Sequence, residues 1–367
     1  MLLSLSLLVA GLVLLVFGAE ILVKGASHLA TAAGVPALIV GLTVVAFGTS
    51  APELAVSVRS TLYGEPDIAV GNVIGSNIFN VLFILGGAAL IAPLAISAQL
   101  IKVDVPLMVA TSILLYLFGR DGLLTRWEGA VLFSGIVAYT LGLLIKGRRE
   151  TKQLEAEYEA EFGSRPEVER QRIPLNIFLV IGGVALLVFG ARLLTNSAVD
   201  IARALNVSDL VIALTIVAAG TSLPEVATSF VATYRGERDV AVGNVVGSNV
   251  FNILSVLGAS AFVSPIGLPV SSDAVLVDIP VMLAVTIACV PVFLTRTSID
   301  RWEGALMLVC YIAYVMYLIL DAHADERLPT YQHWMMHAFL PGVLMLLTAS
   351  LLKDGWRGAD ASSTPTA

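Results

Sequence analysis

Two copies of one short motif place a carboxylate inside strongly apolar sequence. The string GTSAPE covers residues 48–53, and GTSLPE covers residues 220–225. Each ends in a glutamate, Glu53 or Glu225, directly after a proline. A charge at the centre of a bilayer costs at least about 2.5–3.5 kcal/mol, so it normally faces a charged partner or a wet cavity. Neither helix interior supplies a nearby Lys, Arg or His, so two converging acids favour a bound cation over a structural ion pair.

Hydroxyl groups accompany each carboxylate at helical spacing. Thr49 and Ser50 precede Glu53 by four and three residues, so their oxygens share one helix face with the acid. Thr221 and Ser222 repeat this spacing in the second motif. The motifs lack a nearby His or Lys base, and this argues against an intramembrane enzyme.

The proline before each glutamate also frees backbone oxygen. Pro52 and Pro224 donate no backbone hydrogen bond and push the chain away from the carbonyl four residues earlier. The carbonyls around Ala46–Gly48 and Ala218–Gly220 then need another partner, and a cation can supply it. Bent backbone at membrane depth is tolerated where it is buried or lines a cavity.

A second set of polar side chains follows each motif. The pairs spaced four residues apart are Ser76 with Asn80 and Ser248 with Asn252. Because both pairs recur at the expected depth of the glutamates, we interpret them as ligands. The flanking Asn77 and Asn249 are interpreted as contacts between helices.

These groups are hard oxygens, which suit Na⁺, Ca²⁺ or Mg²⁺ and not zinc or copper. Of the divalent ions, Ca²⁺ fits best because it accepts about six to eight flexible oxygens.

The elements that must position these residues are membrane helices. Of the 367 residues, 57% are hydrophobic and 13% are charged, and the mean hydropathy is +0.89. A soluble domain could not bury so much apolar surface, so the composition indicates a polytopic protein of the lipid bilayer. Cys289 and Cys310 lie in apolar segments and suggest neither disulfides nor a metal site. No nucleic-acid-binding face is evident.

Apolar stretches long enough to cross a bilayer, about 20 residues, form two sets of five and one further stretch. The first set covers 2–23, 37–62, 67–91, 103–119 and 125–146. The second covers 173–199, 209–234, 239–264, 275–295 and 301–321, and the further stretch covers 333–352. The first stretch has no basic leader and is interpreted as a span, not a signal peptide.

The second set repeats the first. LLVFGA at 14–19 recurs at 186–191, and residues 38–86 match residues 210–258 at 29 of 49 positions. Because each five-helix unit has an odd number of spans, the second copy enters the membrane from the opposite side. We therefore predict an all-α polytopic membrane protein with two inverted five-helix repeats, a ten-helix core, plus an eleventh transmembrane helix.

The repeats suggest four parts. These are a first membrane repeat at 1–146, a charged cytoplasmic loop at 147–172, a second, inverted repeat at 173–321, and an extra transmembrane helix with a polar tail at 322–367. An outer N-terminus puts 15 of the 21 Lys and Arg residues at the inner surface. This asymmetry predicts a multi-pass protein of the cell (inner) membrane, with its N-terminus outside and its C-terminus cytoplasmic.

The paired strings GTSAPE…GNVIGSNIFN and GTSLPE…GNVVGSNVFN resemble the two α-repeats of the calcium/cation antiporter superfamily, in particular the prokaryotic relatives of sodium/calcium exchangers. The resemblance covers about residues 1–321. It implies a core in which the second, third, seventh and eighth helices surround the ions. The first and sixth helices would slide across that core to alternate access.

The resemblance also implies roles for individual residues. Glu53 and Glu225 would bind both Ca²⁺ and Na⁺, and Thr49 and Thr221 would supply oxygens to Ca²⁺. The Na⁺ sites would be completed by Ser50, Ser222, Ser76, Ser248, Asn80 and the carbonyls of Ala46 and Ala218. Many exchangers carry Asp at one of the positions held here by Asn80 and Asn252, so this site is limited to two negative charges.

These expectations define a secondary active antiporter that exchanges Ca²⁺ for Na⁺. A proton-coupled Ca²⁺ or other cation antiporter is the main alternative, because a desolvated glutamate beside another binds protons more tightly. A cation channel is a further alternative. No cofactor is expected beyond the transported ions Ca²⁺ and Na⁺ (or H⁺), and one chain holds the whole site, so a monomer would suffice for transport.

Overall fold

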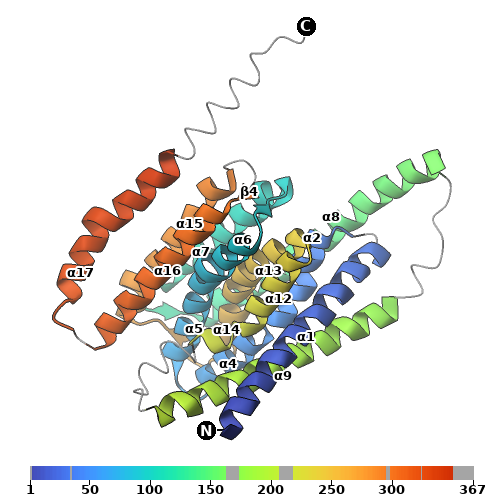
Figure 1. The fold of residues 1–367 in the computed structure, drawn as a ribbon. Coiled ribbons are helices and arrows are strands. Elements are labelled where there is room, and N and C mark those ends of the chain that lie inside the picture. Colours follow the sequence, from blue (N-terminus) through green and yellow to red (C-terminus); the bar gives the residue numbers. More distant parts are fainter. Residues whose placement is uncertain are drawn as a thin grey trace.

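The chain folds into a bundle of membrane-length helices (Figure 1). The computed structural model describes residues 2–33, 35–162, 173–205, 218–294, 298–323 and 325–349. Within these ranges, eight helices are long and apolar enough to cross a membrane, and a bent pair over 37–62 makes a ninth span. The predicted all-α polytopic fold is confirmed. The first part of the predicted span at 209–234 lies outside the described residues.

The elements of each half follow the same order. The first half contains α1 (Leu2–Ala33), α2 (Ala37–Val40), η1 (Gly41–Val45), α3 (Ala46–Thr49), α4 (Ala51–Leu62), α5 (Pro66–Phe79), η2 (Asn80–Leu85), α6 (Gly86–Ile91), β1 (Leu94–Ala95), η3 (Leu100–Asp104), α7 (Val105–Gly119), β2 (Leu123–Leu124) and α8 (Arg126–Phe162). The second contains α9 (Ile173–Ala204), α11 (Ala218–Gly220), α12 (Leu223–Tyr234), α13 (Arg238–Phe251), η6 (Asn252–Leu257), α14 (Gly258–Val263), β3 (Leu268–Pro269), η7 (Ala274–Asp278), α15 (Ile279–Leu294), β4 (Ser298–Ile299) and α16 (Arg301–Ala322). The elements α17 (Leu328–Trp334) and η8 (Met335–Phe339) follow, and the backbone stays helical over 340–349.

The spans that carry the motifs are interrupted at equivalent places. The helix through η1 and α3 meets α4 at a bend of 44°. Ser50 at this junction leaves the helical conformation, with ψ near 5°, and Ser222 does the same, with ψ near 7°. A proline in the first turn of the next helix explains both breaks. The π-helical segments η2 and η6 begin at Asn80 and Asn252, and such turns are frequent at functional sites.

Short strands in the loops join the two halves. β1 pairs antiparallel with β4, and β2 pairs antiparallel with β3. Each pair therefore connects a loop of the first repeat to a loop of the second. The sequence did not predict these pairs, because two-residue strands carry no alternating pattern.

Two long helices, α1 and α9, pack along each other at one side of the bundle (Figure 1). Glycines at the contact bring their backbones together. A Cβ atom added at Gly183 would lie 2.6 Å from the backbone nitrogen of Leu22, and one at Gly11 would lie 2.7 Å from that of Leu194. Such small-residue contacts are a common way for membrane helices to pack closely.

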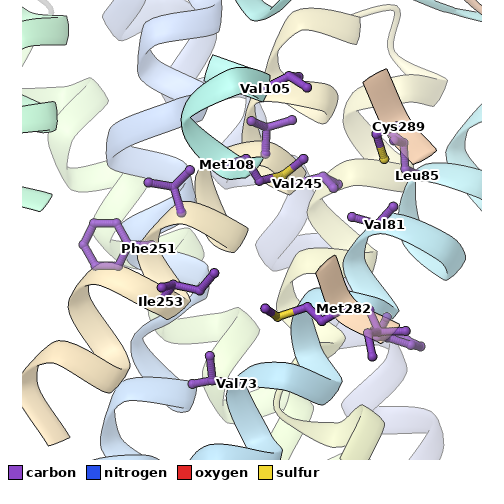
Figure 2. Close-up of a cluster of buried hydrophobic side chains, with 14 of the residues drawn as sticks. Val73, Val81, Leu85, Val105, Met108, Val245, Phe251, Ile253, Met282 and Cys289 are labelled. Carbon is purple, nitrogen blue, oxygen red and sulfur yellow. The ribbon is translucent and has the colours of Figure 1, made fainter. Parts of the chain in front are cut away.

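The main apolar core lies between helices of both halves. Its buried side chains come from α5, η2, α7, α13, η6 and α15, among other elements. Figure 2 shows part of this core, with Met108 of α7 and Met282 of α15 among the labelled residues. α5 and α13 cross this core and carry Ser76 and Ser248, and the spans that they begin are the most buried of the eight, so these ligands lie deep inside the protein.

Two segments differ in detail from the predicted boundaries. α8 stays helical to Phe162, so residues 147–162 continue the fifth span as a helix, while 163–172 lie outside the described residues. The C-terminal helix lies at the edge of the bundle (Figure 1). It packs on α16, where the hydroxyl of Tyr331 donates a hydrogen bond of 2.8 Å to the carbonyl of Ala313. That this last helix spans the membrane stays a prediction.

Candidate ion-binding site

The two motif glutamates meet in the interior, and each is held by the opposite half. Ser50 donates a hydrogen bond of 3.0 Å to Oε1 of Glu225, and Ser222 donates one of 3.0 Å to Oε1 of Glu53. Glu53 is 0% exposed and Glu225 is 1% exposed. In the part of the chain that the structure describes, Oε2 of each carboxylate has no hydrogen-bond partner. Two buried carboxylate oxygens are therefore left for another ligand.

The serines of the following spans are buried, and the one on α5 lies beside Ser222. The hydroxyl oxygens of Ser76 and Ser222 are 3.0 Å apart. Ser76 is 2% exposed and Ser248 is 0% exposed. The hydroxyl of Ser248 has no partner among the described residues. Ser76 thus adds oxygen to the cluster around Glu53, and Ser248 offers a second buried hydroxyl.

Four asparagines form a lattice of amides between the two halves. The side-chain nitrogen of Asn80 donates a hydrogen bond of 3.0 Å to Oδ1 of Asn249, and that of Asn252 donates one of 3.0 Å to Oδ1 of Asn77. The side-chain nitrogens of Asn77 and Asn249 donate to each other's backbone carbonyls, at 3.3 and 3.4 Å.

This lattice fixes the direction of the amides that the sequence assigned to the ion. Because the nitrogens of Asn80 and Asn252 are engaged, their oxygens point away from the lattice, and both oxygens are buried without a partner among the described residues. Asn77 and Asn249 join the helices, as interpreted from the sequence. Sulfur atoms close the lattice, with Met282 Sδ 3.6 Å from the nitrogen of Asn77 and Met108 Sδ 3.5 Å from that of Asn249.

The threonines bond to asparagines that sequence reasoning missed. Thr49 donates a hydrogen bond of 3.1 Å to Oδ1 of Asn244, and Thr221 donates one of 3.2 Å to Oδ1 of Asn72. Both asparagines occupy the repeated string AVGN, residues 69–72 and 241–244, and this recurrence was the signal that could have found them.

The carbonyl oxygen of Ala46 is less free than the following proline suggested. The carbonyl of Ala46 accepts a bond of 3.0 Å from the backbone nitrogen of Ser50, and the hydroxyl of Thr49 lies 3.4 Å away. A carbonyl has two lone pairs, so a cation at Ala46 would share the oxygen with Ser50. Ala218 begins α11 and is the first described residue of the second motif span.

This arrangement offers a cation two charges and a surplus of neutral oxygens. In the described ranges, no group of three or more His, Cys, Asp or Glu side chains could hold a metal ion. The oxygens come instead from carboxylate, hydroxyl and amide groups, which suit Na⁺ and Ca²⁺ and are poor ligands for zinc or copper.

Comparison with known proteins agrees with the fold and the motifs. The family model described as sodium/calcium exchanger protein matches residues 3–145 and 175–320. The chain is 40% identical to CaxA of Alkalimonas amylolytica over an alignment of 327 residues. This alignment covers 88% of this chain and 100% of CaxA. It is 31% identical over 343 residues to the sodium/calcium exchanger MaX1 of Methanosarcina acetivorans, which covers 85% of this chain and 97% of MaX1.

The structure of a sodium-calcium exchanger is similar over most of its length. A solved structure of the exchanger NCX_Mj superposes with a TM-score of 0.73 at 30% identity, and covers 86% of this chain and 99% of NCX_Mj. The shared fold is the ten-helix inverted repeat of a transporter and not that of an enzyme. From the family match, the relatives and this fold, we conclude that the chain belongs to the sodium/calcium exchanger family.

Proposed function

We propose that this protein is a secondary active antiporter that exchanges Ca²⁺ for Na⁺ around the Glu53–Glu225 pair. The observation that carries the proposal is the buried pair itself, in which each carboxylate keeps one oxygen without a partner among the described residues. Buried charges are strongly unfavourable without a counter-ion. A cation that bridges the two oxygens relieves this cost, and the sodium/calcium exchanger MaX1 is a relative of the chain.

Exchange follows from competition for the same oxygens. Ca²⁺ would bind between Glu53 and Glu225 with the hydroxyls of Thr49 and Thr221. Na⁺ would use the same carboxylates with serine and amide oxygens and the carbonyls of Ala46 and Ala218. Two carboxylates neutralise one Ca²⁺, whereas several Na⁺ ions would carry a surplus positive charge. Both loads cannot occupy the site together, so binding of one displaces the other.

Alternating access is supported by a difference between the two ends of the site. At one end Thr49 is fully buried, as is its partner Asn244. At the other end Thr221 and its partner Asn72 are partly exposed. At the buried end, which contains Thr49, α1 packs along α12. The equivalent pair at the other end, α9 and α4, makes fewer contacts. If α1 and α9 slide together, the packing at the two ends would be exchanged.

The proposed orientation gives the two ends their sides. With the N-terminus outside in the cell membrane and the C-terminus cytoplasmic, the sealed end faces the cytoplasm. The site in this state is then reached from outside. The charged segment at 147–172 would lie on the cytoplasmic side, between the two membrane repeats.

Transport by reconstituted protein tests the proposal. Proteoliposomes loaded with Na⁺ and diluted into Na⁺-free medium with radiolabelled Ca²⁺ should take up Ca²⁺, and external Na⁺ should stop the uptake. Uptake that ignores the Na⁺ gradient but follows a pH step would reject sodium coupling in favour of proton coupling. Uptake without stimulation by counterflow would indicate a channel.

An ion pair at the sealed end predicts a shift in access. Arg235, which follows α12, bonds to Glu20 of α1 at 2.8 Å beside a pocket of about 620 Å³ that is lined by both charged and apolar side chains. Both side chains are partly exposed, so the pair contributes less than about 1 kcal/mol. Removing it with Glu20→Gln should favour opening at this end and lower the half-saturating cytoplasmic Ca²⁺ concentration by about two- to fivefold.

The measurement is Na⁺-driven Ca²⁺ flux in vesicles of defined orientation. The charge-swapped double variant Glu20→Arg, Arg235→Glu should return the value toward that of the wild type, because it remakes the pair. An unchanged half-saturating concentration in Glu20→Gln and Arg235→Gln would show that the pair does not control access.

A further inference from the structure

Two asparagines outside the predicted ligand set stand next to the Ca²⁺-binding threonines of the proposed function. Asn72 lies on α5 and Asn244 at the equivalent place on α13. Each side-chain oxygen accepts a hydrogen bond from the threonine of the opposite motif, Asn72 from Thr221 and Asn244 from Thr49. Neither reaches the carboxylate oxygens through any hydrogen bond that the described residues make.

The direction of these amides is fixed by a chain of hydrogen bonds. Ser57 donates its hydroxyl to the carbonyl of Ala69 at 3.4 Å, so its oxygen must accept from the side-chain nitrogen of Asn72 at 2.9 Å. That nitrogen also points at the carbonyl of Glu53, at 3.4 Å. With its nitrogen engaged, Asn72 can present only its oxygen to Thr221, because an amide has one donor end and one acceptor end.

The second half repeats this chain of bonds. Ser229 donates to the carbonyl of Ala241 at 3.5 Å and accepts from the nitrogen of Asn244 at 3.0 Å. The same nitrogen points at the carbonyl of Glu225, at 3.4 Å. Asn244 is 0% exposed, and within the described residues its amide is satisfied at both ends.

The consequence concerns the threonine oxygens. A hydroxyl carries one hydrogen and two lone pairs. Thr49 lies 3.1 Å from Oδ1 of Asn244 and 3.4 Å from the carbonyl of Ala46, so Asn244 is the nearer acceptor of its hydrogen. Thr221 donates its hydrogen to Asn72 at 3.2 Å. The lone pairs of both threonines are therefore turned away from the amides. A cation needs lone pairs and is repelled by a hydroxyl hydrogen, so the bond prepares the threonine as a ligand before the ion arrives.

We propose that Asn72 and Asn244 are positioning residues that favour Ca²⁺ over Na⁺ by orienting the hydroxyls of Thr221 and Thr49. The inference rests on the proposed function, in which these threonines serve Ca²⁺ while serine, amide and carbonyl oxygens complete the Na⁺ sites. In this proposal, each repeat supplies the asparagine that orients the threonine ligand of the other repeat.

The test compares the two ions in the full-length protein. Asn244→Ala and Asn72→Ala should each raise the half-saturating Ca²⁺ concentration by about fivefold to tenfold, the effect of one lost hydrogen bond. The half-saturating Na⁺ concentration should change less than about twofold. Na⁺-driven Ca²⁺ uptake in proteoliposomes measures both half-saturating concentrations, and calorimetric titration with Ca²⁺ in detergent gives the Ca²⁺ affinity separately. Asn196→Ala, at an exposed asparagine of α9, serves as the matched control.

A double-mutant cycle separates positioning from general support of the fold. In a Thr49→Val background, Asn244→Ala should have little further effect on Ca²⁺, because the hydroxyl that it orients is gone. In a Thr49→Ser background the effect should remain. Size-exclusion profiles check folding. If Asn244→Ala aggregates, the equivalent cycle of Asn72→Ala with Thr221→Val, at the partly exposed end, tests the positioning role instead.

The outcomes are distinct. Equal weakening of Ca²⁺ and Na⁺, or effects that simply add in the Thr→Val backgrounds, would overturn the positioning role while the proposed antiport stands. A wild-type protein that neither binds Ca²⁺ nor exchanges it for Na⁺ would overturn the proposed function and this inference together, before any variant is compared.

Discussion

Replacing either motif glutamate with glutamine should abolish Ca²⁺ exchange. Glu53→Gln and Glu225→Gln keep the size of the side chain and an oxygen that can accept from Ser222 or Ser50, but each removes half of the negative charge. Loss of one partner from a buried set of charges costs about 3–5 kcal/mol. Ca²⁺ affinity should therefore fall by at least about a hundredfold, as measured by calorimetric titration and by Na⁺-driven uptake.

The same substitution away from the site provides the control. Glu326 is exposed between α16 and α17, so Glu326→Gln should bind and transport Ca²⁺ as the wild type does. Glu53→Asp should fall between the extremes, because it keeps the charge and shortens the reach by one methylene. Full activity in both glutamine variants would falsify the site.

The second large effect is expected at the contact between α1 and α9. A Cβ atom at Gly183 would lie 2.6 Å from the backbone nitrogen of Leu22, closer than atoms can approach. Gly183→Ile should therefore push the two helices apart, with an overpacking cost of about 1–3 kcal/mol or more. We expect a lower unfolding temperature and at least about tenfold slower exchange, because the two helices proposed to slide together would no longer pack.

A neighbouring glycine on the same helix gives a matched control. A Cβ atom at Gly182 would meet no heavy atom within 4 Å among the described residues, so Gly182→Ile adds the same side chain without the collision. It should retain most of the stability and flux of the wild type. If Gly183→Ile and Gly182→Ile behave alike in thermal unfolding and in Na⁺-driven uptake, the close backbone contact has no special role.

Much of the fold could be predicted because the sequence contains two copies of the same five-helix unit. The span lengths gave the helices, and the odd number of spans per repeat gave the inverted arrangement. The chemistry of Glu53 and Glu225 predicted that the two would meet, since an isolated acid at that depth has no partner. The bend before α4 followed from Pro52, whose missing amide hydrogen breaks the helical ladder.

What could not be predicted depends on contacts between the halves. Helical spacing puts Ser50 on the same face as Glu53, but in the structure Ser50 bonds to Glu225. Periodicity reports which residues share a face and not what that face meets. The π-helical segments η2 and η6 and the paired loop strands also escape the sequence, because each depends on packing between distant segments. Asn72 and Asn244 differ, because their recurrence in the string AVGN is visible in the sequence, but their bonds to threonines of the opposite half are not.

The crossed bonds from Ser50 to Glu225 and from Ser222 to Glu53 have a consequence for the repeat as a unit. A five-helix repeat alone would bury an acid without the serine that holds it and with only half of the charge that the proposed site requires. Each repeat is thus an incomplete half-molecule that complements a copy of opposite orientation. The two halves are joined through their buried glutamates, the groups whose burial is least favourable. Correct insertion of one half is therefore a condition for the other half to bury its glutamate without a large loss of free energy.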